Sequence, residues 1–156
     1  MESVLYRCKQ FVWEQVQRIA YKVGNGNNTF YRVDRQNIVD KRDDISFDVR
    51  YFECGPEGYT TLEKHQHTHV VIVLRGCGSV LVDRKWHDVK PFDCIVIPGF
   101  TPHQLKNRDA EEPFGFVCIV DQKRDSFQLL SREELTDLLK DTPDLMIPHG
   151  YLTENN

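Results

Sequence analysis

The first apolar residues of the chain recur at three- and four-residue steps, with polar residues between them. This spacing puts the apolar side chains on one stripe of a helix, so it predicts a helix over residues 4–23. The run 24–28, Gly-Asn-Gly-Asn-Asn, follows it and favours a helix stop and a turn. Such a stripe is typical of a packing face. It consists of Val4, Cys8, Phe11, Val12, Val16, Ile19, Ala20 and Val23.

Between residues 29 and 121 the pattern changes to short β-branched and aromatic runs separated by turn residues. Runs of this kind, with no helical segment between them, indicate an antiparallel sandwich or barrel. The nine expected strands are 29–33, 47–54, 60–63, 70–74, 78–82, 86–89, 94–97, 104–106 and 114–120.

A second helix is expected to begin after Ser131. Ser131 as N-cap and Glu134 as its reciprocal partner form a capping box. Leu130 and Leu135 are placed as a hydrophobic staple across the helix start. Pro143 is expected to end this helix, and the polar tail from 148 to 156 to be loose.

The length of 156 residues fits one domain. We expect an N-terminal helix and turn over residues 1–28, a barrel over 29–126, and a C-terminal helix and tail over 127–156. The apolar fraction of 40% is enough for a packed core, which argues against a disordered chain. The apolar runs are far shorter than a membrane-spanning helix needs.

The charge balance narrows the possible partners. The chain has 20 Lys and Arg against 24 Asp and Glu, a net charge of −4. An acidic balance argues against nucleic acid or an anionic membrane as the main partner. The five cysteines form no C-x-x-C pair, and the N-terminus shows no secretory signal. We therefore expect reduced thiols and a cytoplasmic location.

The candidate chemistry lies in one histidine-rich stretch. His65, His67 and His69 follow Glu63 within seven residues, and His103 comes later in the strand region. A single histidine in such a place is more often part of a solvated loop. Three histidines and a carboxylate beside expected strands favour a metal site, since imidazole is a common ligand.

This stretch resembles the first motif of the cupins. In that motif a glycine is followed by H-x-H, a glutamate and a second glycine, and here the stretch 58–76 runs from Gly58 to Gly76. The stretch 91–107 resembles the second motif, which presents one more histidine after a proline turn. The resemblance covers roughly residues 45–121 and implies an antiparallel cupin barrel, or jelly roll, flanked by the two helices.

Spacing back from Gly76 assigns the metal ligands that the resemblance implies. The cupin glutamate position falls on His69, and the H-x-H positions fall on Glu63 and His65. With His103 from motif two, the implied set is Glu63, His65, His69 and His103. A rival assignment takes 65–67 as the H-x-H pair, which makes His67 a ligand in place of Glu63.

Motif two departs from the cupin pattern at two glycines. Phe92 and Phe100 stand where glycines are usual, whereas Pro98, His103 and Asn107 keep their places. The turn that presents His103 is therefore expected to be preserved.

A mixed nitrogen and oxygen ligand set leaves open coordination positions for a substrate and suits Mn, Fe(II), Ni, Co or Zn. No cysteine falls at a ligand position, which weighs against a thiolate-rich structural zinc site.

A closer resemblance within the cupins is to the methylthioxylulose-phosphate methylsulfurylases. It is carried by residues 50–53, 61–69 and 115–121, with Arg124 and Asp125. It implies cleavage of 1-methylthio-xylulose 5-phosphate to 1-deoxyxylulose 5-phosphate, a manganese-type centre, and an external thiol such as glutathione as co-substrate. Cys118 matches the cysteine that accepts the methylthio group in that family.

Two of these residues also have plain structural interpretations. Cys118 stands on a strand among apolar neighbours, where a cysteine is usually buried and inert. Arg50 could bind a substrate phosphate if its side of the strand faces a cavity, or could pair with an aspartate on the barrel surface. Tyr51 and His67 are guesses for a proton donor.

Other functions remain open at this point. The alternatives are another metal cupin enzyme, such as a dioxygenase or sugar-phosphate isomerase, and a cupin that binds a small ligand without catalysis. In each case the expected partner is a small molecule rather than nucleic acid or membrane. A homodimer is expected by analogy with other cupins.

Overall fold

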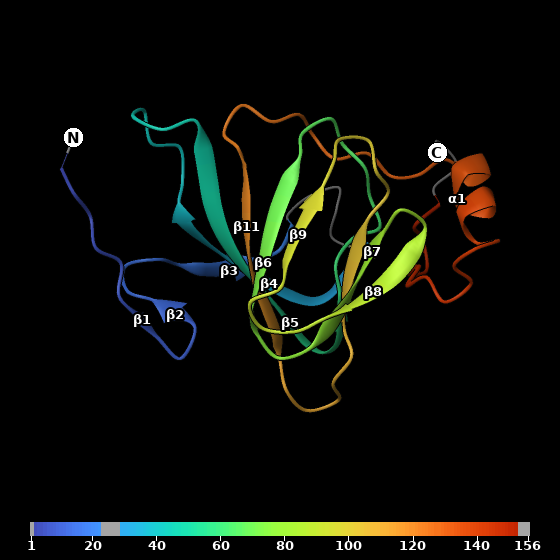
Figure 1. Ribbon diagram of the computed structural model, residues 1–156, viewed down its shortest axis with the longest axis horizontal. Helices are drawn as coiled ribbons and strands as arrows, with labels where there is room; N and C mark the ends of the chain where they lie inside the picture. The colour runs from blue at the N-terminus through green and yellow to red at the C-terminus, as the bar shows by residue number, and fades with distance from the viewer. Residues whose placement is uncertain (1, 23–28, 153–156) are drawn as a thin grey trace.

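The computed structural model describes residues 2–22 and 29–152 of the chain. In that part the chain forms short strands and a single helix (Figure 1). The strands are β1 Cys8–Lys9, β2 Val12–Trp13, β3 Arg18–Ala20, β4 Tyr31–Val39, β5 Phe47–Tyr59, β6 His69–Arg75, β7 Gly78–Val82, β8 Lys85–Val89, β9 Cys94–Ile97, β10 Gln104–Asn107 and β11 Phe114–Asp121; the helix is α1 Arg132–Leu138.

A curled nine-stranded antiparallel sheet makes up most of the molecule (Figure 1). Its main path runs β8-β7-β10-β5-β11-β6-β9, with β4 added beside β5 and β3 beside β4. The long strand β5 pairs with β4, β10 and β11, so it ties the two halves of the sheet together. The all-β antiparallel barrel expected from the strand pattern is confirmed.

Apolar side chains fill the curl of the sheet. Alternate residues of β11 point inward, and Phe116, Cys118 and Val120 belong to one buried cluster with Val71 and Val73 of β6. A second cluster lies under α1 and joins it to the barrel. None of the described helices has the length and apolar character to cross a membrane.

The helix expected over residues 4–23 is wrong. The described residues of this segment form the β1–β2 hairpin and β3. Gln10, Phe11 and Gln15 have positive φ, which a right-handed helix excludes. Long-range hydrogen bonds replace the helical ones, since Gln36 accepts from the Trp13 amide and donates to the Phe11 carbonyl.

The apolar stripe of this segment is divided between two environments. Phe11 packs on the ring of Tyr51, as the neighbouring Trp13 does, whereas Val4 and Val12 are exposed. Strand β3 pairs with β4 and so covers that edge of the sheet. Tertiary pairing therefore overrides the helical spacing. The turn expected over 24–28 lies outside the described residues.

The second helix is confirmed together with its N-terminal cap, although it ends at Leu138, before Pro143 is reached. The side chain of Ser131 accepts from the Glu134 amide, and the Glu134 carboxylate accepts from the Ser131 amide. The expectation of a loose tail is wrong for the residues up to 152. Tyr151 is 1% exposed, and its hydroxyl donates to the Leu62 carbonyl and accepts from the Leu130 amide, so the tail docks on the barrel.

Candidate metal centre

Two chain segments that are distant in sequence are held together at the mouth of the barrel. The residues expected as a strand over 60–63 form only an isolated bridge, in which Glu63 and His103 exchange both backbone hydrogen bonds at 3.1 and 2.9 Å. His65 follows this bridge, and His69 opens β6. The local backbone thus brings histidines from both sequence motifs to one place.

Three imidazoles meet there. His65, His69 and His103 are buried, and each offers a ring nitrogen within 4.8 Å of the other two. Their ring centroids are 4.4 Å apart for His65–His69, 4.8 Å for His65–His103 and 5.2 Å for His69–His103. A buried cluster of three imidazoles is suited to one transition-metal ion.

The hydrogen bonds of two rings orient them for a metal. The Nδ1 atoms of His65 and His103 each lie 2.9 Å from a backbone carbonyl, that of His67 and Thr101 respectively. A ring that donates from Nδ1 presents a lone pair on Nε2. Both Nε2 atoms are buried and have no hydrogen-bond partner. The residues present therefore fit a bound metal.

Electrostatics keep these rings in the neutral form that binds metals. Burial, helped by His103 and His67, lowers the pKa of His65 to about 4. Burial also lowers the pKa of His69 and of His103. At neutral pH the three nitrogens are therefore unprotonated, as metal ligation requires.

His67 lies beside the cluster. Its Nε2 is 3.1 Å from Nε2 of His69, and its ring stacks on His65 at 3.7 Å between centroids. Its Nδ1 lies 2.6 Å from Oδ1 of Asp125. The Asp125 carboxylate also accepts from the backbone amides of Gln66 and His67. These donors hold the pKa of the Asp125 carboxyl below its usual range. His67 is thus fixed in place, next to the three buried rings.

Glu63 is brought to the same cavity but is partnered differently. Its carboxylate forms an ion pair with Lys22 and accepts from the Tyr21 hydroxyl at 3.5 Å. Glu63 does not join the three-histidine group, although its charge attracts His65 and His103. Lys22 was not singled out by the sequence, because it lies among the polar positions of the expected helix, just before a glycine-rich run.

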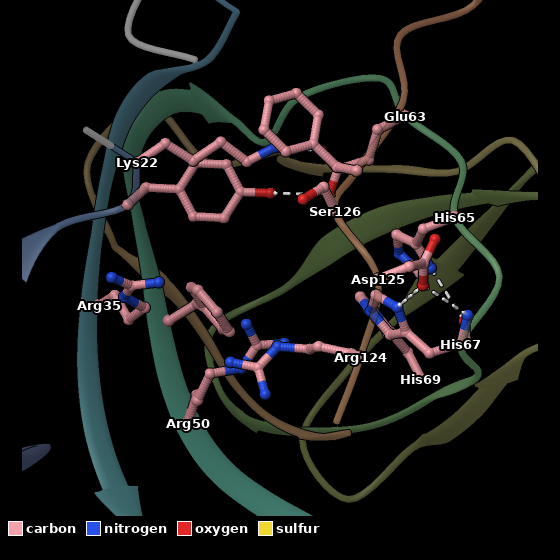
Figure 2. A pocket seen from close by; sticks show the side chains of 13 residues that line it. Lys22, Arg35, Arg50, Glu63, His65, His67, His69, Arg124, Asp125 and Ser126 are labelled. Carbon is pink, nitrogen blue, oxygen red and sulfur yellow. Dashed lines mark hydrogen bonds and ion pairs between the residues drawn. The ribbon is translucent and has the colours of Figure 1, made fainter. Parts of the chain in front are cut away.

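A cavity of about 260 Å³ lies against these residues (Figure 2). Its lining side chains come from β4, β5 and β6, from the segments that follow β3 and precede β6, and from the segment after β11. Its lining is Tyr21, Lys22, Arg35, Arg50, Phe52, Glu63, His65, His67, His69, Arg124, Asp125, Ser126 and Phe127.

Arg50 faces this cavity and not the outer surface. Arg50 and Cys118 are directly opposite each other in the β5–β11 register, and Arg50 Nη2 lies 3.5 Å from Cys118 Sγ. Cys118 is 2% exposed. Burial raises the pKa of the Cys118 thiol, and the positive charge of Arg50 opposes that rise.

Tyr51, one of the two guesses for a proton donor, points elsewhere. It alternates with the cavity-lining residues Arg50 and Phe52, so it lies on the outer face of β5. Its hydroxyl donates to Glu53 at 2.9 Å. Tyr51 is therefore dropped, whereas His67 does line the cavity.

The turn that presents His103 is preserved despite its two phenylalanines. Phe92 and Phe100 have φ of 75° and 61°, the left-handed conformation that suits glycine. The Phe100 amide donates to the His65 carbonyl at 2.6 Å. Asn107 donates to the carbonyls of Cys54 and Gly55 on β5 and of Glu112 in the following loop. The backbone of this motif thus persists without its usual glycines.

Comparisons with known proteins agree with this fold. The model of the cupin domain matches residues 50–120. A 1-methylthio-D-xylulose 5-phosphate methylsulfurylase from Rhodospirillum rubrum is 39% identical over 132 residues, which cover 85% of this chain and 83% of that protein.

Two solved structures have the same architecture. A cupin-2 domain from Rhodospirillum rubrum is 36% identical with a TM-score of 0.77, covering 89% of this chain and 91% of that one. A cupin 2 conserved barrel domain protein from Rhodopseudomonas palustris is 33% identical with a TM-score of 0.79, covering 88% and 93%.

Proposed function

This chain belongs to the cupin family, and from that premise we propose that it is a metal-dependent enzyme that cleaves 1-methylthio-xylulose 5-phosphate to 1-deoxyxylulose 5-phosphate. The observation that carries this proposal is the contact of a buried thiol, Cys118, with Arg50, which lines the same cavity as His65 and His69. The name of the 39% identical relative supports the choice of substrate.

The proposed metal ligands are His65, His69, His103 and Glu63. The two unpartnered Nε2 atoms support the histidines, and the cavity-facing carboxylate supports Glu63. A divalent ion, with manganese favoured and Fe, Ni, Co or Zn as alternatives, would supply Lewis acidity to the substrate carbonyl when bound. The four protein groups leave coordination positions for substrate oxygens.

The proposed nucleophile is the Cys118 thiolate. It attacks the methylthio sulfur, the bond between sulfur and carbon 1 breaks, and the electron pair passes to the substrate as the enolate of its C2 carbonyl. Cys118 is left as a methyl disulfide, and carbon 1 takes a proton, for which His67 is the proposed donor. A first external thiol removes the methylthio group as a mixed disulfide and restores the Cys118 thiolate. A second thiol then releases methanethiol and leaves the two external thiols as a disulfide.

Arg50 has two proposed roles. Its guanidinium stabilises the Cys118 thiolate across 3.5 Å, in a place where burial alone would keep the thiol protonated. It also lines the cavity, where it binds the substrate. A dioxygenase, the main alternative, would consume oxygen, whereas this reaction releases methanethiol without it.

The decisive experiment uses Cys118→Ser, which keeps the size of the side chain. With the methylthio sugar phosphate and glutathione, the variant is expected to bind metal and lose turnover. The unsubstituted protein, given substrate but no thiol, should gain one methylthio group at Cys118 in intact and peptide mass spectra. Cys94→Ser is the matched control, because Cys94 is exposed and outside the cavity. An active Cys118→Ser enzyme, with no adduct on the native chain, contradicts the mechanism.

A homodimer through the outer sheet face is also proposed. Neighbouring strands present Val70, Ile72, Val96, Val117 and Ile119 outward in register, and β9 forms an edge of the main sheet path. An apolar patch at a sheet edge can be covered by the same patch of a second copy around a two-fold axis. Val96→Lys should convert a dimer to a monomer in light scattering, and a monomeric native chain contradicts the proposal.

A cytoplasmic location is proposed as well. The five cysteines are all free, which is the state that the reducing cytosol maintains.

A further inference from the structure

The cavity holds more positive charge than its own carboxylates neutralise. Lys22, Arg35, Arg50 and Arg124 all line it. Two of the four have strong partners, because Lys22 pairs with Glu63, and Arg124 pairs with the buried Asp48 behind the cavity wall. The remaining acid of the lining, Asp125, is occupied by His67 and by backbone amides.

Arg35 and Arg50 are left without a carboxylate partner within ion-pair distance among the described residues. The Nε atom of each is buried and makes no hydrogen bond. Burial lowers the pKa of Arg35, and the nearby charges of Arg50 and Arg124 lower it further. Unsatisfied guanidiniums that repel one another are costly, so their position calls for an anion.

The sheet fixes these two arginines close together. Arg50 on β5 is opposite Asn37 on β4, and Arg35 is two residues from Asn37, so Arg35 and Arg50 are diagonal neighbours on one face. The Arg50 guanidinium lies 5.1 Å from the centre of the Phe52 ring, which limits its movement. In Figure 2 the side chains of Arg35, Arg50 and Arg124 lie on one side of the cavity, and the imidazoles lie on the other.

We propose that Arg35 and Arg50 form a phosphate subsite that binds the phosphate monoester end of the substrate. Two planar guanidinium forks match the oxygens of a dianion, which also neutralises the two unpaired charges. Arg124, held by Asp48, adds positive potential without a free charge of its own. The phosphate at the arginine side directs the other end of the molecule toward the histidines.

The identity of the sugar rests on the proposed function, whereas the phosphate is inferred from the two unpaired arginines of the cavity. The test therefore measures binding, not turnover, by calorimetry on the full-length protein with D-xylulose 5-phosphate, D-xylulose and inorganic phosphate. Arg35→Gln is expected to weaken binding of D-xylulose 5-phosphate about 10- to 100-fold, the effect of losing charge-assisted hydrogen bonds. Binding of D-xylulose should not change. Arg35→Lys should give an intermediate loss, because it keeps the charge without the fork.

Arg132→Gln is the matched control, since Arg132 is exposed on α1 and far from the cavity lining. Unchanged affinity of Arg35→Gln for the phosphorylated sugar overturns the proposal. An equal loss for D-xylulose also overturns it, because the side chain would then act on the sugar or on the fold. If the native protein binds D-xylulose 5-phosphate through Arg35 but does not release methanethiol, the subsite stands and only the proposed reaction fails.

Discussion

The guanidinium of Arg50 and the thiol of Cys118 lie 3.5 Å apart on adjacent antiparallel strands, directly opposite each other in register. Both side chains point into the curl of the sheet, where the cation contacts a thiol that is 2% exposed. The Nη2 atom of Arg50 makes this contact, and its buried Nε makes no hydrogen bond. Arg50 therefore acts on the reactivity of the thiol and also takes part in the proposed binding of an anion.

Replacement of Arg50 should make Cys118 less reactive. Burial already raises the pKa of this thiol, and Arg50 is the largest opposing influence, so Arg50→Gln raises the pKa further. Less thiolate is then present at any given pH, and alkylation of Cys118 by iodoacetamide should slow several-fold at pH 8. The rate-against-pH curve should shift to higher pH. Peptide mass spectrometry measures the labelling of each cysteine.

Cys94 provides the internal control for that experiment, because it is exposed in the same chain. Its labelling rate should be the same in both proteins. Arg35→Gln separates the two roles of the arginine pair, since Arg50 and not Arg35 donates to the thiol, so Arg35→Gln should alter substrate binding more than labelling. Equal labelling of Cys118 in native and Arg50→Gln protein contradicts the role assigned to Arg50.

Loss of a buried histidine should remove the metal. His65→Ala or His103→Ala deletes an Nε2 atom that has no partner in the protein, so the fold loses no hydrogen bond to that atom. Elemental analysis of anaerobically purified protein should show stoichiometric metal in the native chain and a small fraction of it in either variant. His87→Ala is the control, because His87 is exposed on β8.

The same analysis decides between the two assignments of the fourth ligand. Glu63→Gln should lower the metal content if Glu63 is a ligand, whereas His67→Gln should retain it. The reverse result supports His67, which lies 3.1 Å from His69. A stoichiometric metal content in both His65→Ala and His103→Ala would contradict the three-histidine centre.

The histidine cluster could be predicted from the sequence because its residues fall in two motifs. His65 and His69 are four residues apart beside a strand, and the resemblance to the second cupin motif pointed to His103, which is distant from them in sequence. The capping box at Ser131 could be predicted because its two residues are close in sequence. Interactions within a few residues leave a signature that spacing can show.

The arginine pair and the N-terminal segment depend on partners that are distant in sequence. Arg35 was missed because the strand was expected to end at 33, whereas β4 continues to Val39 through pairing with β5. The alternation of Val33, Arg35 and Asn37 was the available signal. Residues 4–22 carry helical spacing, yet Gln36 and Tyr51 bind Phe11 and Trp13 of the β1–β2 hairpin. These contacts with the barrel, and not the local spacing of apolar residues, determine the structure of this segment.

Phe100 is expected to lower the stability of the fold by its backbone conformation. It has φ of 61° and a side chain 61% exposed, so the ring gains little burial while a residue with Cβ is held in the left-handed region. Phe100→Gly should raise the free energy of unfolding by about 1 kcal/mol relative to Phe100→Ala, which removes the ring but keeps the strain. Urea unfolding of the metal-free proteins measures the difference, because metal binding would otherwise add to stability. If the glycine and alanine variants unfold at the same urea concentration, the turn beside His103 is not strained, and the phenylalanine is tolerated without cost.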